Sequence, residues 1–326
     1  MTRRGIICGG SIVVDVNKVI DRLPPAQELA VIQSETADTG GPGLNMAVDL
    51  ARLGCGFPVQ LVGLVGDDAH GRLVLETCAA LGIDTAGVGV LPGMSTSYTD
   101  VMIERSTGRR TFFHFQGANG QLGPEQFDFT DTTARMFHLG APGVHQRMDA
   151  DGPHGNGFAE VLARARAAGL RTNLELVCVE PERIRALAGP CLAHLDTIIV
   201  NELEAAAITG RDDPMEAARE LIRLGVRDLA VVHFPAGSVA AAADGRHWRQ
   251  AAVRVPSGEI RSSNGAGDAF AAGVILGLHD GLPVERCLAQ GVCVAAVSLL
   301  SLSTSAGILP LADCLAYGER KGFTSA

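Results

Sequence analysis

The sequence lacks three features that would narrow its class at once: a long apolar run, closely paired cysteines and an excess of positive charge. A membrane-spanning helix needs about 20 consecutive apolar residues, so none is predicted. The 27 Lys and Arg against 36 Asp and Glu give a net charge of −9, which argues against nucleic acid and anionic membranes as partners. The eight cysteines lack metal-site spacing, so we expect reduced, mostly buried thiols in a cytoplasmic protein.

Several catalytic and nucleotide-binding motifs are also absent. There is no G-x-x-x-x-G-K-[ST], and no complete G-x-G-x-x-G opens a helix after a strand. The absence of G-x-S-x-G disfavours an α/β-hydrolase. No two of the nine histidines have H-x-x-x-H spacing, so we treat them as ordinary residues.

What the sequence does contain is a helix start with almost no side chains. Gly265, Ala266 and Gly267 precede Asp268, and small and apolar residues then continue at helical spacing. Bare N–H groups at a helix N-terminus bind anions, and glycine lets an oxyanion approach the backbone closely. Asp268 beside such a cradle suits a base that takes a proton from an attacking nucleophile. The alternative is an ordinary first-turn acid behind a tight turn.

Two further polar stretches adjoin predicted helices. Gly40, Gly41 and Gly43 precede a helix predicted over Met46–Gly54, with Asn45 as a possible plain cap. Asn201 and Glu204 follow a predicted strand, and their spacing suits a hydrated Mg²⁺ that also contacts phosphates. Taken alone, this second pair is better explained as a helix cap with a first-turn acid.

Strands and helices alternate along most of the chain, which predicts a parallel α/β sheet. Gly5–Val16 is predicted as a single buried strand, with Asp15 near its ligand-binding end. Short strands are predicted at Val88–Leu91, Thr96–Glu104 and Arg109–Phe115, and they indicate a small projecting sheet. We expect one domain, residues 1–326, with lid strands drawn from about 27–39 and 96–115.

The order of these motifs resembles the ribokinase-like (PfkB) carbohydrate kinase family. The residues that carry the resemblance are Gly10-Ser11 with Asp15, Gly40–Ala47, Gly63–Asp68 with Gly71, Asn201–Glu204, and Gly265–Asp268. The resemblance implies a three-layer α/β/α sandwich with a mostly parallel central sheet and a small β-sheet lid. It also implies ATP-dependent transfer of a phosphoryl group to a hydroxyl, expected to be primary, of a small carbohydrate or sugar acid.

The resemblance also implies roles for individual residues. Asp268 would be the catalytic base, beside an anion hole made by the N–H groups of Gly265, Ala266 and Gly267. The residues near ATP and Mg²⁺ would be Asn201, Glu204, Asn264, Gly265 and Gly267, with Glu204 reaching the metal through water or phosphate. The sugar would contact Asp15, Gly40, Gly41, Gly43 and Asn45 beneath the lid. We also expect a homodimer formed through the lid.

Departures from the family pattern refine these expectations. Ser262 stands where an acid normally supports a monovalent cation, so we expect at most weak potassium activation. Val13, Pro42 and Gly140 replace the asparagine, lysine and glutamate that contact ribose in relatives, which disfavours ribose as substrate. The segment Val231–Gly237 departs from the Thr-x-Gly-x-x-Gly pattern that lines the nucleotide, so nucleotide preference can differ.

Two other functions remain open. A nucleoside kinase uses the same scaffold, but aromatic residues make up only 4% of the chain, with one cluster at Phe112, Phe113 and Phe115. A catalytically silent sugar-binding regulator is the second alternative. The intact Asp268 and anion-hole glycines argue against it.

Overall fold

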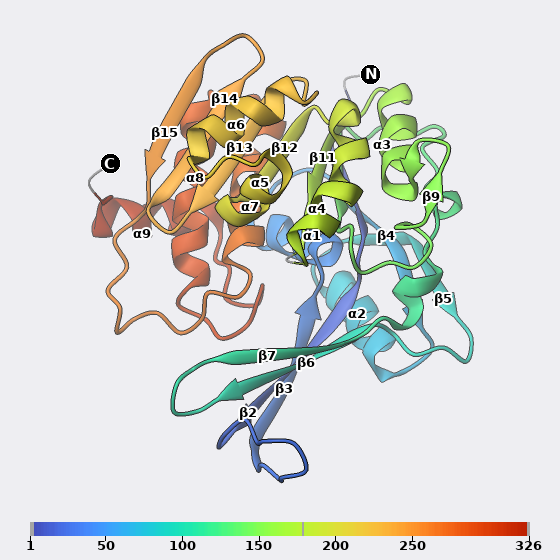
Figure 1. Cartoon of the computed structure of the whole chain (residues 1–326), viewed down its shortest axis with the longest axis vertical. Helices are drawn as coiled ribbons and strands as arrows, with labels where there is room; N and C mark the ends of the chain where they lie inside the picture. The colour runs from blue at the N-terminus through green and yellow to red at the C-terminus, as the bar shows by residue number, and fades with distance from the viewer. Residues whose placement is uncertain (1–2, 178, 325–326) are drawn as a thin grey trace.

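Within residues 3–177 and 179–324, which the structure describes, nine strands form a central sheet in the computed structural model (Figure 1). Their order across the sheet is β15-β14-β13-β12-β11-β8-β1-β4-β5. The strands are β1 (Ile6–Gly10), β4 (Val59–Gly66), β5 (Asp84–Leu91), β8 (Met136–Gly140), β11 (Arg171–Glu175), β12 (Thr197–Asn201), β13 (Leu229–Phe234), β14 (Gly237–Ala242) and β15 (His247–Ala251). Neighbours from β5 to β13 are parallel, and β14 and β15 form an antiparallel edge.

Successive residues of a strand point to opposite sides of the sheet, and the central strands are apolar on both sides. Helices therefore cover both faces of this sheet. Ile199 packs in the core beneath α1, α7 and α8, whereas its neighbours Ile198 and Val200 pack with α3, α5 and α6. The helices are α1 (Pro42–Leu53), α2 (Ala69–Ala80), α3 (Gly157–Ala167), α4 (Pro181–Ala188), α5 (Glu202–Thr209), α6 (Pro214–Arg223), α7 (Ala266–His279), α8 (Val284–Ser298) and α9 (Leu311–Lys321). The predicted three-layer sandwich is therefore confirmed.

Short elements complete the body: β9 (Asp151–Gly152), β10 (Gly155–Asn156) and the 3₁₀ helices η1 (Gly117–Gln121), η2 (Pro124–Gln126) and η3 (Gly189–His194). In the described part of the chain, no helix combines the length and the apolar character needed to cross a bilayer. The seven cysteines in that part are free thiols, and Cys178 lies outside the described residues.

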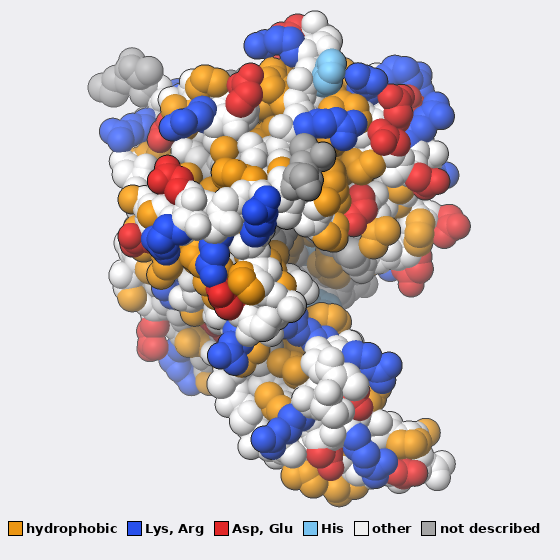
Figure 2. Space-filling model, turned by 90° about the vertical axis from the view of Figure 1, so that its left-hand side faces the viewer, with side chains coloured by type: hydrophobic (Ala, Val, Ile, Leu, Met, Phe, Trp, Pro, Cys, Tyr) orange, Lys and Arg blue, Asp and Glu red, His pale blue; other side chains and the backbone are white. Residues whose placement is uncertain are grey.

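A four-stranded sheet, the lid, projects from the body in the order β3-β2-β6-β7 (Figures 1 and 2). Its strands are β2 (Val13–Ile20), β3 (Ile32–Gly40), β6 (Tyr98–Glu104) and β7 (Arg110–Phe115). Strand β2 is antiparallel to β3 and parallel to β6, and β6 is antiparallel to β7. The predicted small lid sheet is thus present, with β2 as an additional strand.

Two strand predictions were wrong. The single strand predicted over Gly5–Val16 is two strands, because the chain leaves the central sheet at Gly10 and enters the lid at Val13. Gly10 has φ 108° and lies so close to Gly140 that no Cβ would fit, which lets the chain change direction inside one apolar run. The strand predicted at Val88–Leu91 belongs to β5 at the edge of the central sheet, not to the lid.

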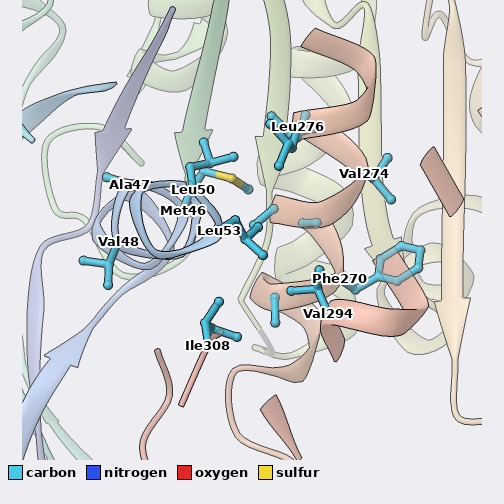
Figure 3. Close-up of a cluster of buried hydrophobic side chains, with 14 of the residues drawn as sticks. Met46, Ala47, Val48, Leu50, Leu53, Phe270, Val274, Leu276, Val294 and Ile308 are labelled. Atoms are coloured by element: carbon cyan, nitrogen blue, oxygen red, sulfur yellow. The ribbon is translucent and has the colours of Figure 1, made fainter. Parts of the chain in front are cut away.

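Helices α1 and α7 pack side by side beneath the lid junction. Figure 3 shows Met46, Leu50 and Leu53 of α1 facing the helix that carries Phe270 and Val274. Burying side chains of this size contributes about 1.5–3 kcal/mol each to folding. This packing determines how the first turns of the two helices lie relative to each other.

Candidate active site

The first turn of α7 is a bare, glycine-capped helix start, at the position where the sequence analysis placed an anion hole. Gly265 caps the helix with φ 76°, and a Cβ there would lie 2.5 Å from Thr304 Cγ2 and 2.6 Å from the Thr304 carbonyl oxygen. Only glycine fits this position without displacing backbone. The first N–H groups of a helix have no partner within it and suit an anion. At this turn Ala266 N–H donates a long hydrogen bond of 3.4 Å to the Ser263 carbonyl oxygen, which lies outside the helix.

The two glycine-rich helix starts meet at Asp268. Asn45 Nδ2 donates a hydrogen bond to Asp268 Oδ2, and Ser305 Oγ contacts Asn45 Oδ1 at 3.4 Å. Asn45 is not a helix cap, because α1 begins at Pro42 and its cap is Gly41, so the helix starts one turn before the predicted Met46. Proline at the first helical position suits this earlier start.

Asp15 reaches the same site from the lid strand β2. Asn264 Nδ2 donates to Thr304 Oγ1 at 2.9 Å, and Thr304 Oγ1 donates to Asp15 Oδ2 at 3.3 Å. Burial raises the pKa of Asp15 to about 7; the Thr304 hydrogen bond opposes this rise and the charge of Asp268 adds to it. This chain of contacts joins the lid to the loop that precedes α7.

The three glycines near residue 40 have packing explanations. A Cβ at Gly40 would lie 2.6 Å from Asp15 Cγ, so glycine makes room for that carboxyl group. A Cβ at Gly41 would lie 2.7 Å from the Ser11 carbonyl oxygen, and one at Gly43 would lie 2.7 Å from that of Gly9. These glycines bring α1 close to the end of β1, and thereby place Asn45 at the site.

Asn201 and Glu204 form the helix cap that the sequence left open as an alternative. Glu204 N–H donates to Asn201 Oδ1 at 2.9 Å, and Asn201 N–H donates to Glu204 Oε2 at 3.0 Å. Burial raises the pKa of Glu204 to about 7, the Asn201 backbone hydrogen bond lowers it, and the charge of Asp268 raises it further. Glu204 is therefore close enough to Asp268 for the two charges to interact. A cation bound there would favour the ionised form of Glu204.

The sequence analysis missed Glu175, the last residue of β11. His138 Nε2 lies 3.1 Å from Glu175 Oε2, and Asn173 Nδ2 lies 2.9 Å from His138 Nδ1. Burial raises the pKa of Glu175 well above its usual range, with the charge of Asp268 and a hydrogen bond to it adding to the rise. Burial also lowers the pKa of His138 to about 4. Burial thus favours the neutral form of both groups.

A signal for Glu175 was present in the sequence. It is a carboxylic acid at the ligand-binding end of an apolar strand, the same position that drew attention to Asp15. In the register of β8 and β11 it lies opposite Gly140, the position where the family pattern has a glutamate. The acid is thus carried by the neighbouring strand.

Comparisons with known proteins agree with this geometry. The model of the pfkB family carbohydrate kinases matches residues 3–311. An ATP-dependent ribose-1-phosphate kinase of Halopiger xanaduensis is 30% identical over 298 residues, covering 87% of this chain and 88% of the relative. A ribokinase of Arabidopsis thaliana is 26% identical over 304 residues, covering 90% of this chain and 75% of the relative.

Other relatives are named deoxyribokinase, fructokinase and cytidine kinase. The structure of Arabidopsis thaliana ribokinase complexed with ribose and ATP superimposes with a TM-score of 0.80 at 23% identity, covering 98% of this chain and 99% of that chain. Since the family model spans nearly the whole sequence and the expected glycine-rich helix start with its aspartate is in place, the chain belongs to the pfkB family of carbohydrate kinases.

Proposed function

We propose that this protein is an ATP-dependent kinase that phosphorylates a hydroxyl, expected to be primary, of a small carbohydrate or sugar acid. The family establishes a phosphotransferase with an alcohol acceptor. The observation that carries the proposal is the contact of Asn45 with Asp268 at the glycine-rich start of α7. It supports the proposal of a carboxylate base beside a backbone that would bind the transferring group.

In this proposal, Asp268 accepts the proton of the sugar hydroxyl while Asn45 holds its carboxylate in position. The N–H groups of Gly265, Ala266 and Gly267 stabilise the negative charge on the group in transfer. Phosphoryl transfer requires mainly positioning and electrostatic stabilisation, and these residues supply both. When bound, Mg-ATP supplies the phosphoryl group and the cation that neutralises its charge.

The residues present fit such a nucleotide and metal. Glu204 is a buried carboxyl group within the field of Asp268, and Mg²⁺ is commonly held by one or two carboxylates together with substrate phosphates. Among the described residues, no group of three or more His, Cys, Asp or Glu side chains forms a metal cage. The metal would therefore depend on the phosphates as well as on Glu204, with Asn201 holding that carboxylate through the cap.

On the acceptor side, Asp15 and Asn45 are the polar groups we assign to the sugar. We assign Gly40, Gly41 and Gly43 to the same site as the backbone that makes room for Asp15 and brings Asn45 to it. Pro42 lies against Gly140, where an added Cβ would be 2.6 Å from Pro42 Cβ. Pro42 stands where relatives have a lysine, which supports an acceptor other than ribose, whereas the acid missing at Gly140 has a counterpart in Glu175 on the neighbouring strand.

A nucleoside acceptor is the second candidate. Phe112 of the lid is 56% exposed and lines a groove at the site, so it offers a surface for stacking. A cytidine kinase among the relatives also favours this candidate. A sugar-binding protein without kinase activity is the third reading, and it predicts ligand binding without ADP release.

Three further features belong to the proposal. We propose weak potassium activation, because Ser262 offers a neutral hydroxyl where the family pattern has an acid. We propose a homodimer formed through the lid, which carries exposed apolar side chains at Phe112, Phe113 and Phe115. The free thiols of the described cysteines suit a reducing compartment, and we propose the cytoplasm.

The test is a screen of sugars, sugar acids, sugar phosphates and nucleosides for ADP release in the presence of Mg-ATP, with thermal shifts recorded in parallel. The proposal expects at least one sugar or sugar acid to give turnover that is lost in Asp268→Asn. Turnover of nucleosides alone would support the second candidate. Thermal shifts without ADP from any compound would support the silent binder.

A further inference from the structure

Arg110 is a charged residue that the proposed reaction does not yet use. It begins β7, and its guanidinium Nη2 donates to Ser262 Oγ in the loop before α7. Alternate residues of a strand share a face, so Arg110 lies on the same side of the lid as His114. His114 is opposite Thr99 in β6, and Thr99 is opposite Asp15 in β2. Arg110 therefore lies on the face that carries Asp15.

Arg110 lines a groove of about 480 Å³ between the lid and the loop before α7. The residues that line this groove are Gly108, Arg110, Phe112, Ile260, Arg261, Ser262, Ser263 and Asn264. Figure 2 shows Lys and Arg side chains gathered where the lid narrows and joins the body. The groove opens beside the residues assigned above to the acceptor and to the anion hole.

The groove carries positive charge from two arginines, and the charge of Asp15 acts on one of them, Arg110. In the part of the chain that the structure describes, neither Arg110 nor Arg261 forms an ion pair with a carboxylate. Burial lowers the pKa of Arg110, and the charge of Asp15 opposes that effect. The one hydrogen-bond partner described for Arg110 is a neutral hydroxyl, so its positive charge is available to a ligand.

The adjacent residue shows that this arrangement is specific to Arg110. Arg109 Nε lies 3.5 Å from Glu104 Oε2, and the Arg109 side chain is 75% exposed. One arginine of the pair is thus neutralised at the surface, and the other is directed into the groove. A half-buried guanidinium with fork geometry binds carboxylate and phosphate groups strongly.

We infer that Arg110, with Arg261 at the rim of the groove, binds an anionic group of the acceptor, a phosphate or carboxylate carried away from the hydroxyl that reacts. This inference rests on the proposed kinase function and specifies its substrate class. We assign the anionic group to the acceptor and not to the nucleotide, because Arg110 shares the lid face with Asp15, on the sugar side of the site. The phosphates of ATP are the other anionic groups that Arg110 could bind, and the experiment distinguishes them from an anionic group on the acceptor.

The experiment uses the full chain and matched acceptors that differ in one anionic group: ribose against ribose 1-phosphate, and glucose against gluconate. Calorimetry without ATP measures binding, and ADP release with Mg-ATP measures kcat and KM. We compare the parent with Arg110→Gln, with Arg110→Lys, and with Arg109→Gln as the adjacent control. We expect the anionic member of at least one pair to bind the parent about tenfold or more tightly than its neutral partner.

We further expect Arg110→Gln to weaken that binding by about 10- to 100-fold, the size of one lost charge-assisted contact. Arg110→Lys should recover part of the loss, and the KM for ATP should change less than threefold. Arg109→Gln should behave as the parent. The inference is overturned if neither anionic compound binds more tightly than its neutral partner. It is also overturned if Arg110→Gln raises the KM for ATP by as large a factor as it weakens acceptor binding. Binding of this kind without any ADP release would support the anion site and reject the kinase proposal instead.

Discussion

Asp268 is the residue on which the proposed chemistry depends. We predict that Asp268→Asn lowers kcat by roughly 10²- to 10⁴-fold, the usual contribution of a positioned proton acceptor. Binding of ATP and acceptor should change little, because an amide of the same shape still accepts a hydrogen bond from Asn45. Steady-state kinetics with the best acceptor measure this. The control is Asp280→Asn at the other end of α7, and an Asp268→Asn enzyme within a few-fold of the parent would reject the assignment.

Asp15 illustrates a cost of the site to stability. Its pKa of about 7 in the folded protein, against 3.8 in an ordinary environment, means that folding favours its protonated form. The contribution of Asp15 to the free energy of unfolding is therefore most favourable below pH 3.8, and it is lost as the pH rises toward and through 7. Between pH 5 and pH 8 this loss amounts to about 2–3 kcal/mol.

We predict that Asp15→Asn removes this pH dependence. The free energy of unfolding of the variant, relative to the parent, should rise by about 2–3 kcal/mol from pH 5 to pH 8. Urea unfolding without ligands at the two pH values measures the effect, with exposed Asp313→Asn as control. The same variant should bind the acceptor more weakly. A constant difference between variant and parent across this range would contradict the assigned pKa.

At the scale of the element, the first turn of α7 is a backbone surface that tolerates little side-chain volume. A Cβ at Gly267 would lie 3.3 Å from His233 Cε1, so valine there crowds both the imidazole and the anion position. We predict that Gly267→Val lowers kcat by about 10²- to 10³-fold, as expected when an anion-hole donor is lost or misdirected. Gly189→Val, where an added Cβ meets nothing, is the matched control. Normal turnover in a folded Gly267→Val protein would remove this turn from the mechanism.

We expect the loop before α7 to set the response to potassium. Ser262 provides a neutral oxygen, and the guanidinium of Arg110 already occupies one side of it, which opposes a second cation. We predict less than tenfold stimulation by potassium, and a larger dependence in Ser262→Asp. ADP release is measured in choline buffer and again after potassium is added. Tenfold stimulation of the parent, equal to about 1.4 kcal/mol of transition-state stabilisation, would show that the missing carboxylate is unimportant.

At the scale of the whole molecule, the lid is an exposed sheet with apolar residues on both faces. Phe113 lies on the face opposite to Arg110, and its side chain is 54% exposed. We predict that the chain is a dimer and that Phe113→Asp weakens dimerisation by about 30-fold or more, the effect of losing a strong interface residue. Light scattering after size-exclusion chromatography over a concentration series measures this. Leu224→Asp, an exposed apolar position on the body, should leave the mass unchanged, and a monomeric parent would contradict the prediction.

Local features were predictable because they depend on short-range backbone geometry. Glycines around residues 40 and 265 indicated two bare helix starts, and alternation of apolar strands and helices indicated the three-layer fold. The position of Asp15 was predicted less well. An uninterrupted β-branched run from residue 5 to residue 16 does not show that the chain leaves one sheet at Gly10 and enters another.

By itself, therefore, the sequence determined the family, the fold class and the glycine-rich turn before Asp268. The turn depends on residues close together along the chain, and the family and fold class depend on the order in which such local patterns follow one another. Only the tertiary structure decided which distant groups meet. Glu175 lies beside Asp268 because β11 and the start of α7 meet at one edge of the sheet. Arg110 contacts Ser262 across 152 positions of sequence because the lid folds over that loop. No local pattern encodes such pairings, since they arise from how separate elements pack.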